Sequence, residues 1–123
     1  RQMGFSSIED YLINGWEGRF LELDANDILS MIETWQSGDI SDNLRYGGDF
    51  ELALRAISAK ALVMPSQTDQ YFPREDSEIE VGLMPSAQLR VIPSIWGHLA
   101  GGPGRNPVDT QFIDASLKEL LAS

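Results

Sequence analysis

The chain has 123 residues, of which 42% are apolar, and its formal net charge at pH 7 is −10. This length suits one domain, and the apolar fraction is large enough to build a core. The acidic balance disfavours nucleic acids and anionic membranes as partners because both bind clustered positive charge, and no apolar run is long enough to span a bilayer.

The chain has no cysteine and one histidine. The lack of cysteine excludes a disulfide scaffold, a thiolate metal site and a cysteine nucleophile, and one histidine makes a poor zinc site. We therefore expect no bound metal and no bound cofactor. No basic leader followed by an apolar segment is visible, and a cysteine-free chain suits a reducing compartment, so we expect a cytoplasmic location.

The first part of the chain predicts helices, over residues 6–20 and 24–38. Serine and aspartate residues can cap their amino ends, and Gly38 can end the second helix. Apolar residues recur on one face of each, at Ile8, Tyr11 and Leu12 in the first and at Ile28, Met31, Ile32 and Trp35 in the second. A turn-rich segment follows, and then a short helix that begins behind Asp49.

The second half of the chain changes pattern and alternates strands with helices. The apolar runs predict strands over residues 61–64 and 88–94, and the helices are expected between Pro73 and Pro85 and over residues 107–121. The last helix should bury a stripe of Ile113, Leu117, Leu120 and Leu121. This order is a βαβα unit, whose two strands should be parallel and joined by a right-handed crossover. The sequence thus predicts an α/β fold.

Two residues that can carry chemistry follow the two predicted strands. Asp69 lies in the loop after the first strand, and His98, the one histidine, lies in the loop after the second. Loops at the carboxyl ends of parallel neighbours share one edge of a sheet, so the two side chains can meet. A carboxylate that accepts from imidazole Nδ1–H fixes the tautomer and leaves the other nitrogen to act as a general base.

Each of these residues also has a plainer interpretation. Asp69 alone suits a turn, because aspartate is a common turn former, and His98 alone suits an ordinary loop position. Their placement after consecutive parallel strands favours the catalytic interpretation for the pair. The tryptophans at positions 35 and 96 are expected to pack in the core or under a lid rather than to bind substrate.

The chain resembles the C-terminal part of an α/β-hydrolase-fold enzyme, and is most similar to the homoserine O-acetyltransferase branch. Residues 8–35 are similar to the helical lid segment of that branch, and residues 45–73 to the stretch that leads into its acid loop. The motif D-x-x-F-P at 69–73 is the most specific part, and "VIPSIWGH" at 91–98 matches the final strand and the histidine. The resemblance implies that Asp69 is the acid of a serine triad and His98 its base.

Two features differ from that branch. Leu99 follows the histidine, where the branch has an aspartate. The chain also contains no G-x-S-x-G, the motif that carries the nucleophilic serine at a sharp strand-to-helix turn. Because the triad order in this fold is serine, acid, histidine, the serine is expected on an N-terminal part of the same precursor or on a second chain.

The resemblance therefore implies an acyltransferase that moves an acyl group from acyl-CoA, as co-substrate, to an alcohol through an acyl-serine. A serine esterase of the same fold and a catalytically inactive interaction module are the alternatives, together with a small independent α/β protein in which both residues are incidental. We expect residues 1–48 to form a helical lid and residues 49–123 to form part of the hydrolase core. The complete enzyme is expected to be a homo-oligomer.

Overall fold

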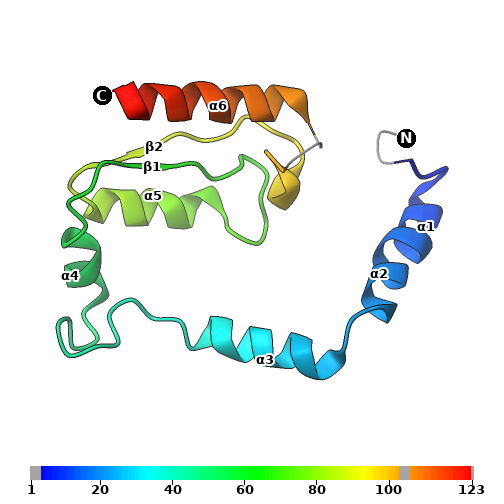
Figure 1. Ribbon diagram of the computed structural model, residues 1–123, viewed down its shortest axis with the longest axis horizontal. Coiled ribbons are helices and arrows are strands. Elements are labelled where there is room, and N and C mark those ends of the chain that lie inside the picture. The colour runs from blue at the N-terminus through cyan, green and yellow to red at the C-terminus, as the bar shows by residue number, and fades with distance from the viewer. Residues whose placement is uncertain (1–3, 103–105, 123) are drawn as a thin grey trace. The chain divides into compact units, whose positions relative to one another are not determined.

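The computed structural model describes residues 4–102 and 106–122. The chain divides into two compact units, Arg1–Asp39 and Ile40–Ser123. Figure 1 shows helices in the first unit and a mixture of helices and strands in the second. The assignment of residues 1–48 as a lid stays a prediction, and the segment 40–48 clusters with the second unit.

The first unit begins with a continuous helical segment that changes its hydrogen-bonding pattern. Its three parts are α1 (Ile8–Asp10), η1 (Tyr11–Glu17) and α2 (Gly18–Leu21). Ser7 caps the start, since its hydroxyl accepts from the Asp10 N–H at 3.0 Å. The expected helix is confirmed, but its middle part η1 is a π-helix. In this wider turn residues five apart come together, and Trp16 Nε1 donates to the Tyr11 hydroxyl at 2.7 Å.

The second helix of this unit is α3 (Ala25–Gln36), as the apolar spacing predicts. The Asp24 carboxylate caps it by accepting from the backbone N–H groups of Asn26 at 2.8 Å and Asp27 at 3.4 Å. This cap satisfies two of the amides that a helix leaves without partners at its amino end. Met31 and Trp35, on the predicted apolar face, are exposed in the structure.

The second unit holds the α/β part of the chain. Its elements are α4 (Phe50–Arg55), β1 (Ala61–Val63), α5 (Arg74–Leu83), β2 (Ala87–Leu89), η2 (Gly97–Leu99) and α6 (Pro107–Ala122). Strands β1 and β2 pair in parallel, with Ala61 opposite Ala87 and Val63 opposite Leu89. Figure 1 shows this pair between α5 on one side and α6 on the other. The expected βαβα order and the parallel pairing are confirmed.

Both strands are shorter than the apolar runs predict. Regular pairing stops at Val63 and Leu89, and Pro65 follows, whose nitrogen carries no hydrogen to donate. Single hydrogen bonds continue the contact, from Ile92 N–H to the Pro65 carbonyl at 2.8 Å and from Gln67 N–H to the Ile92 carbonyl at 3.0 Å. The two chains therefore stay side by side up to the loops that carry Asp69 and His98.

Helix α6 begins as expected, because the Asn106 side chain accepts from the Val108 N–H at 3.1 Å. Its buried residues are Asp109 and Ser116, whereas Leu117 and Leu121 of the predicted apolar stripe are exposed. The predicted stripe is therefore confirmed in part. Ile113 and Leu120 are half-buried on the same face as Asp109 and Ser116, where the Asp109 carboxylate accepts from the Ser94 hydroxyl.

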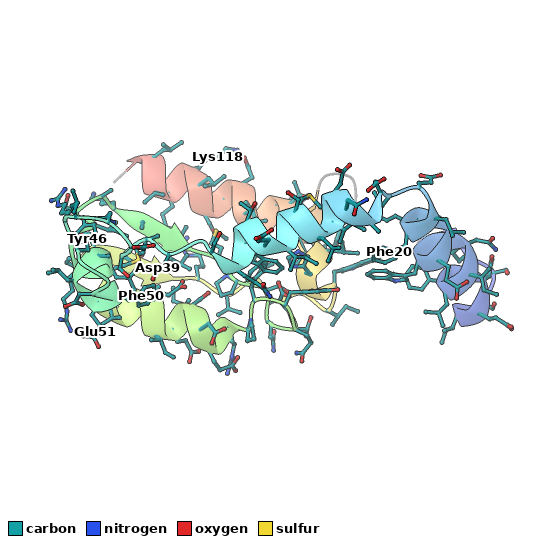
Figure 2. All side chains as sticks on the ribbon, turned by 90° about the horizontal axis from the view of Figure 1, so that it is seen from below. Phe20, Asp39, Tyr46, Phe50, Glu51 and Lys118 are labelled. Atoms are coloured by element: carbon teal, nitrogen blue, oxygen red, sulfur yellow. The ribbon has the colours of Figure 1, made fainter. Side chains whose placement is uncertain are left out.

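The outer side of α6 is polar at Lys118, which Figure 2 labels and which pairs with Asp114 at 2.7 Å.

The apolar residues that are buried in the second unit are Ala53, Leu54 and Ile92. Across the residues that the structure describes, no helix is both long and apolar enough to cross a membrane.

Candidate active site

Asp69 lies in the loop between β1 and α5 and is 9% exposed. Its Oδ1 accepts from the backbone N–H groups of Tyr71 at 2.8 Å and Phe72 at 3.3 Å. These bonds form an Asx turn, in which a short side chain replaces a backbone acceptor. The backbone of its own loop thus holds the Asp69 carboxylate, independently of its contact with a distant residue.

The other carboxylate oxygen contacts His98. Asp69 Oδ2 lies 3.1 Å from His98 Nδ1, although the two residues are 29 positions apart in the chain. An ionised carboxylate only accepts hydrogen bonds, so Nδ1 is the protonated nitrogen in this contact and Nε2 is the basic one. The expected meeting of the two side chains is confirmed, and their distance falls within the hydrogen-bond range of about 2.6–3.2 Å.

Asp69 and His98 differ in how far their side chains are exposed to solvent. The Asp69 side chain is 9% exposed and the His98 side chain 48% exposed. A shielded carboxylate interacts more strongly with the imidazole than a solvated one, because water does not screen the contact. The half-exposed ring keeps Nε2 accessible to a reacting group.

The pKa of the Asp69 carboxyl lies below its ordinary value. Burial alone raises it, but the hydrogen bonds from the Tyr71 N–H, the His98 ring and the Phe72 N–H, together with the charge on a protonated His98, outweigh burial. Hydrogen bonds to the charged form favour that form, so Asp69 stays ionised at neutral pH. It can therefore stabilise a positive charge that forms on His98.

Two aromatic rings flank His98. The ring centroids of Tyr71 and Phe72 lie 4.9 Å and 5.3 Å from the imidazole centroid, tilted by 54° and 40°. The sequence interpretation missed this role, although both rings belong to the D-x-x-F-P motif. Because the same turn sets Asp69 and both rings, the acid loop shapes the surroundings of the base as well as holding the acid.

A cavity of about 340 Å³ opens beside the pair. Asp69, Phe72, Ser77, Gly97, His98 and Ala100 contribute to its wall, with Ile92 and the segment from Val63 to Ser66. A second hollow of about 380 Å³ lies near Lys60 and Glu119, and neither Asp69 nor His98 lines it. Of these two cavities, the one at Asp69 and His98 therefore places open space beside an acid–base pair.

A second polar cluster lies behind the histidine loop, and the sequence interpretation did not find it. The Ser94 hydroxyl donates to Asp109 Oδ2 at 2.6 Å and accepts from the Trp96 N–H at 3.1 Å. Ser94 is 4% exposed and Asp109 2% exposed. In the sequence Asp109 reads as an acidic residue in the first turn of a helix, and nothing in that pattern points to Ser94.

Among residues 4–102 and 106–122, no group of three or more histidine or carboxylate side chains is placed to bind an ion. The polar groups that line the cavity suit acid–base chemistry at an organic substrate.

The chain is similar in sequence to proteins named as esterases. No family model matches the chain. The chain is 38% identical to a probable esterase of Corynebacterium glutamicum over 126 residues and 37% identical to an ethyl acetate hydrolase of Pseudomonas veronii over 123 residues. Each alignment covers 100% of the chain and 34% of the relative. A homoserine O-acetyltransferase of Chloroherpeton thalassium is 29% identical over 92 residues, which is 75% of the chain and 24% of that relative.

Solved structures give the same result. An acetylester hydrolase from Corynebacterium glutamicum superposes with a TM-score of 0.87 at 38% identity, over 100% of the chain and 34% of that structure. The acetyl esterase MekB superposes with a TM-score of 0.86 at 37% identity, over 98% of the chain and 34% of that structure. The chain spans about a third of the length of these relatives, and the matched part is their C-terminal third. The fold of this chain is therefore the C-terminal portion of an α/β-hydrolase fold.

Proposed function

We propose that this chain supplies the acid, Asp69, and the base, His98, of a serine triad in an ester hydrolase. The observation that carries the proposal is the 3.1 Å contact between the buried Asp69 carboxylate and Nδ1 of the half-exposed imidazole. The nucleophilic serine and the oxyanion donors come from a polypeptide outside these 123 residues, either an N-terminal part of the same precursor or a second chain. The chain is 38% and 37% identical to two proteins named as esterases, and this similarity favours hydrolysis.

In the proposed reaction, His98 Nε2 removes the proton of the serine hydroxyl as its oxygen attacks the ester carbonyl. Asp69 stabilises the imidazolium that forms. The imidazolium returns the proton to the leaving alcohol, and an acyl-serine remains. Water then attacks the acyl-serine while Nε2 takes one of its protons. The imidazolium returns that proton to the serine oxygen as the bond between this oxygen and the acyl carbon breaks, so the carboxylic acid leaves and the serine hydroxyl and neutral imidazole are restored.

Acetate esters of small alcohols are the proposed substrates. The support is the printed activity of the relatives, an ethyl acetate hydrolase and an acetylester hydrolase. The test is to measure hydrolysis of ethyl acetate, ethyl butyrate and ethyl octanoate by the complete protein that contains this chain. Preference for acetate supports the proposal, and no hydrolysis of any of the three esters contradicts it.

Acyl transfer to an alcohol is the second candidate, because a homoserine O-acetyltransferase is among the relatives. Both reactions share the acyl-serine and differ in whether water or an alcohol attacks it. Incubating the complete protein with acetyl-CoA and homoserine separates them. Formation of O-acetylhomoserine faster than release of acetate would favour transfer, and release of acetate alone would favour hydrolysis. An inactive interaction module would give neither product.

A further inference from the structure

The two loops that carry Asp69 and His98 are joined by one hydroxyl group beyond the end of the strands. Thr68 precedes Asp69, and Gly97 precedes His98. Thr68 Oγ1 donates to the Ser94 carbonyl at 2.9 Å and accepts from the Gly97 N–H at 3.1 Å. A hydroxyl has a single proton, so these two bonds fix both its donor and its acceptor direction. Thr68 thereby connects the acid loop to both ends of the turn that leads into the histidine.

The residue that accepts from Thr68 is itself held in place. The Ser94 hydroxyl is bonded to the Asp109 carboxylate of α6 at 2.6 Å and to the Trp96 N–H at 3.1 Å. Both Ser94 and Asp109 are buried. The carbonyl of Ser94 therefore belongs to a turn fixed against a helix of 16 residues. The hydroxyl of Thr68 therefore donates to a turn that buried hydrogen bonds attach to α6.

The backbones of the two loops also touch at this point. Gly97 has a φ of +54°, and a Cβ atom built on it would lie 3.3 Å from the Thr68 carbonyl oxygen. A side chain at position 97 would therefore be strained by its backbone conformation and would press on the acid loop. The close approach at Gly97 and the hydroxyl bridge of Thr68 together set the spacing of the loops.

We propose that Thr68 is a positioning residue, whose hydroxyl holds the histidine loop where His98 Nδ1 meets Asp69. The role in turnover rests on the proposed function, whereas the effect on the Asp69–His98 contact does not. Without the hydroxyl, the Gly97 N–H and the Ser94 carbonyl lose their partner, and the turn from residue 94 to 98 is free to shift relative to Asp69. A shift of that kind weakens proton transfer without removing a reacting group.

The test replaces Thr68 in the complete protein with valine, which has nearly the same shape and no hydroxyl, and with serine, which keeps the hydroxyl. Thr110→Val is the matched control, because Thr110 is an exposed threonine on α6 whose hydroxyl donates to the Asn106 carbonyl just before the helix, at 3.1 Å. Two readouts are used. One is kcat and KM for ethyl acetate, and the other is the low-field NMR signal of the His98 Nδ1–H, assigned by its loss in His98→Ala.

We expect Thr68→Val to lower kcat by about 10–100-fold and to change KM by less than about twofold. Its Nδ1–H signal should weaken or shift, because the contact with Asp69 loosens. Thr68→Ser should recover most of kcat and the signal, and Thr110→Val should match the wild type in both. If Thr68→Val does not fold, Thr68→Ala, which also lacks the hydroxyl, takes its place in the comparison with Thr68→Ser and should lower kcat and the signal together.

Other results would overturn the inference. A wild-type kcat and an unchanged Nδ1–H signal in Thr68→Val would show that the hydroxyl positions nothing. Equal losses in Thr68→Ser and Thr68→Val would assign the residue a packing role. If the wild-type protein hydrolyses no ester, the proposed function fails, and the NMR comparison alone then decides the inference. Absence of the Nδ1–H signal from the wild type would contradict the contact between His98 and Asp69 that Thr68 is proposed to hold.

Discussion

The two oxygens of the Asp69 carboxylate make different contacts. Oδ1 holds the loop through the Tyr71 and Phe72 amides, and Oδ2 holds His98. An asparagine can keep the first set of bonds through its amide oxygen, but its NH₂ group then faces the imidazole. Nδ1 must accept from that group, and the wrong nitrogen carries the proton.

We therefore expect Asp69→Asn to lower kcat by about 10³–10⁴-fold while the fold is retained, and His98→Ala to be at least as damaging. Steady-state kinetics of the complete protein give the rates, and circular dichroism checks the fold. Asp114→Asn is the control, because Asp114 is an exposed carboxylate paired with Lys118. A near-normal kcat in either Asp69→Asn or His98→Ala would contradict the catalytic role of the pair.

The low pKa of Asp69 leads to a prediction about pH. Hydrogen bonds outweigh burial and depress this pKa in the folded state, so the carboxylate stabilises the fold above the pKa of an unfolded aspartate, about 3.9. This stabilisation falls as the pH drops through the folded pKa. The free energy of unfolding of the wild type should exceed that of Asp69→Asn at pH 6, and the difference should shrink towards pH 3.

Urea unfolding of both proteins at several pH values measures this difference. Asp114→Asn again serves as the comparison. A difference between the wild type and Asp69→Asn that stays constant down to pH 3 would contradict the depressed pKa. The opposite sign, with the difference growing in acid, would mean that burial dominates over the hydrogen bonds.

At the scale of elements, local pattern was enough for most of the fold and part of the site. The i, i+3, i+4, i+7 spacing predicted α3, and the alternation of apolar runs with helices predicted the parallel pair β1 and β2. The pairing of Asp69 with His98 followed, because topology alone brings consecutive strand ends to one edge. These features depend on neighbours in sequence or on the order of elements.

The features that the sequence did not predict depend on contacts between distant residues. The buried polar position of Asp109 on α6 goes with its bond to Ser94, 15 residues away. The length of β1 depends on its register with β2. In this register Pro65 occupies a position whose backbone N–H would donate to β2, and proline has no such hydrogen. None of these contacts leaves a periodic signal in the chain.

The bond between Ser94 and Asp109 should contribute strongly to stability. Ser94→Ala removes the hydroxyl and leaves a buried carboxylate oxygen without that donor, which we expect to cost about 1.5–3 kcal/mol. Asp109→Asn should cost less, because a neutral amide is easier to bury than an unpaired charge. The double variant should lose less than the sum of the single losses, since both changes remove one interaction.

Urea unfolding of the complete protein measures the four free energies of this cycle. Thr110→Ala is a suitable comparison, as it removes an exposed hydroxyl from the same helix. Additive losses in the double variant would indicate that Ser94 and Asp109 act separately. A loss below about 0.5 kcal/mol in Ser94→Ala would place that bond among the ordinary surface contacts.

At the scale of the whole molecule, large apolar side chains remain exposed in both units. Examples are Leu21 at 87%, Leu44 at 107%, Ile95 at 90% and Leu121 at 86%. We predict that residues 1–123 expressed alone aggregate or unfold without cooperativity, because exposed apolar surface and a two-stranded sheet give little stability. Co-expression with the serine-bearing polypeptide should give a soluble complex with a largely apolar interface above about 1,600 Å².

Size-exclusion chromatography and thermal unfolding distinguish the two states. A soluble monomer of residues 1–123 with a sharp thermal transition would contradict the need for a partner. The co-expressed complex provides the positive control, since it must elute at the combined mass and unfold in a single transition.

The chain lacks G-x-S-x-G, so a serine-directed reagent should not label it. We predict that a fluorophosphonate modifies the complete protein at one serine outside these 123 residues. Peptide mapping by mass spectrometry after labelling locates the adduct, and Asp69→Asn should slow the labelling because the base is misaligned. An adduct on any serine of this chain would contradict the assignment of the nucleophile to another polypeptide.

Asp69 and His98 come from consecutive loops of one unit, and both contacts that fix them lie within that unit. In the proposed enzyme, the proton-transfer half of the triad is therefore made on one polypeptide segment and the nucleophile on another. Ester hydrolysis then occurs only when the two segments are assembled. The rate of hydrolysis is therefore proportional to the fraction of segments that are assembled. If each segment is fused to one member of a protein pair, turnover of a fluorogenic acetate becomes a sensor of whether that pair associates.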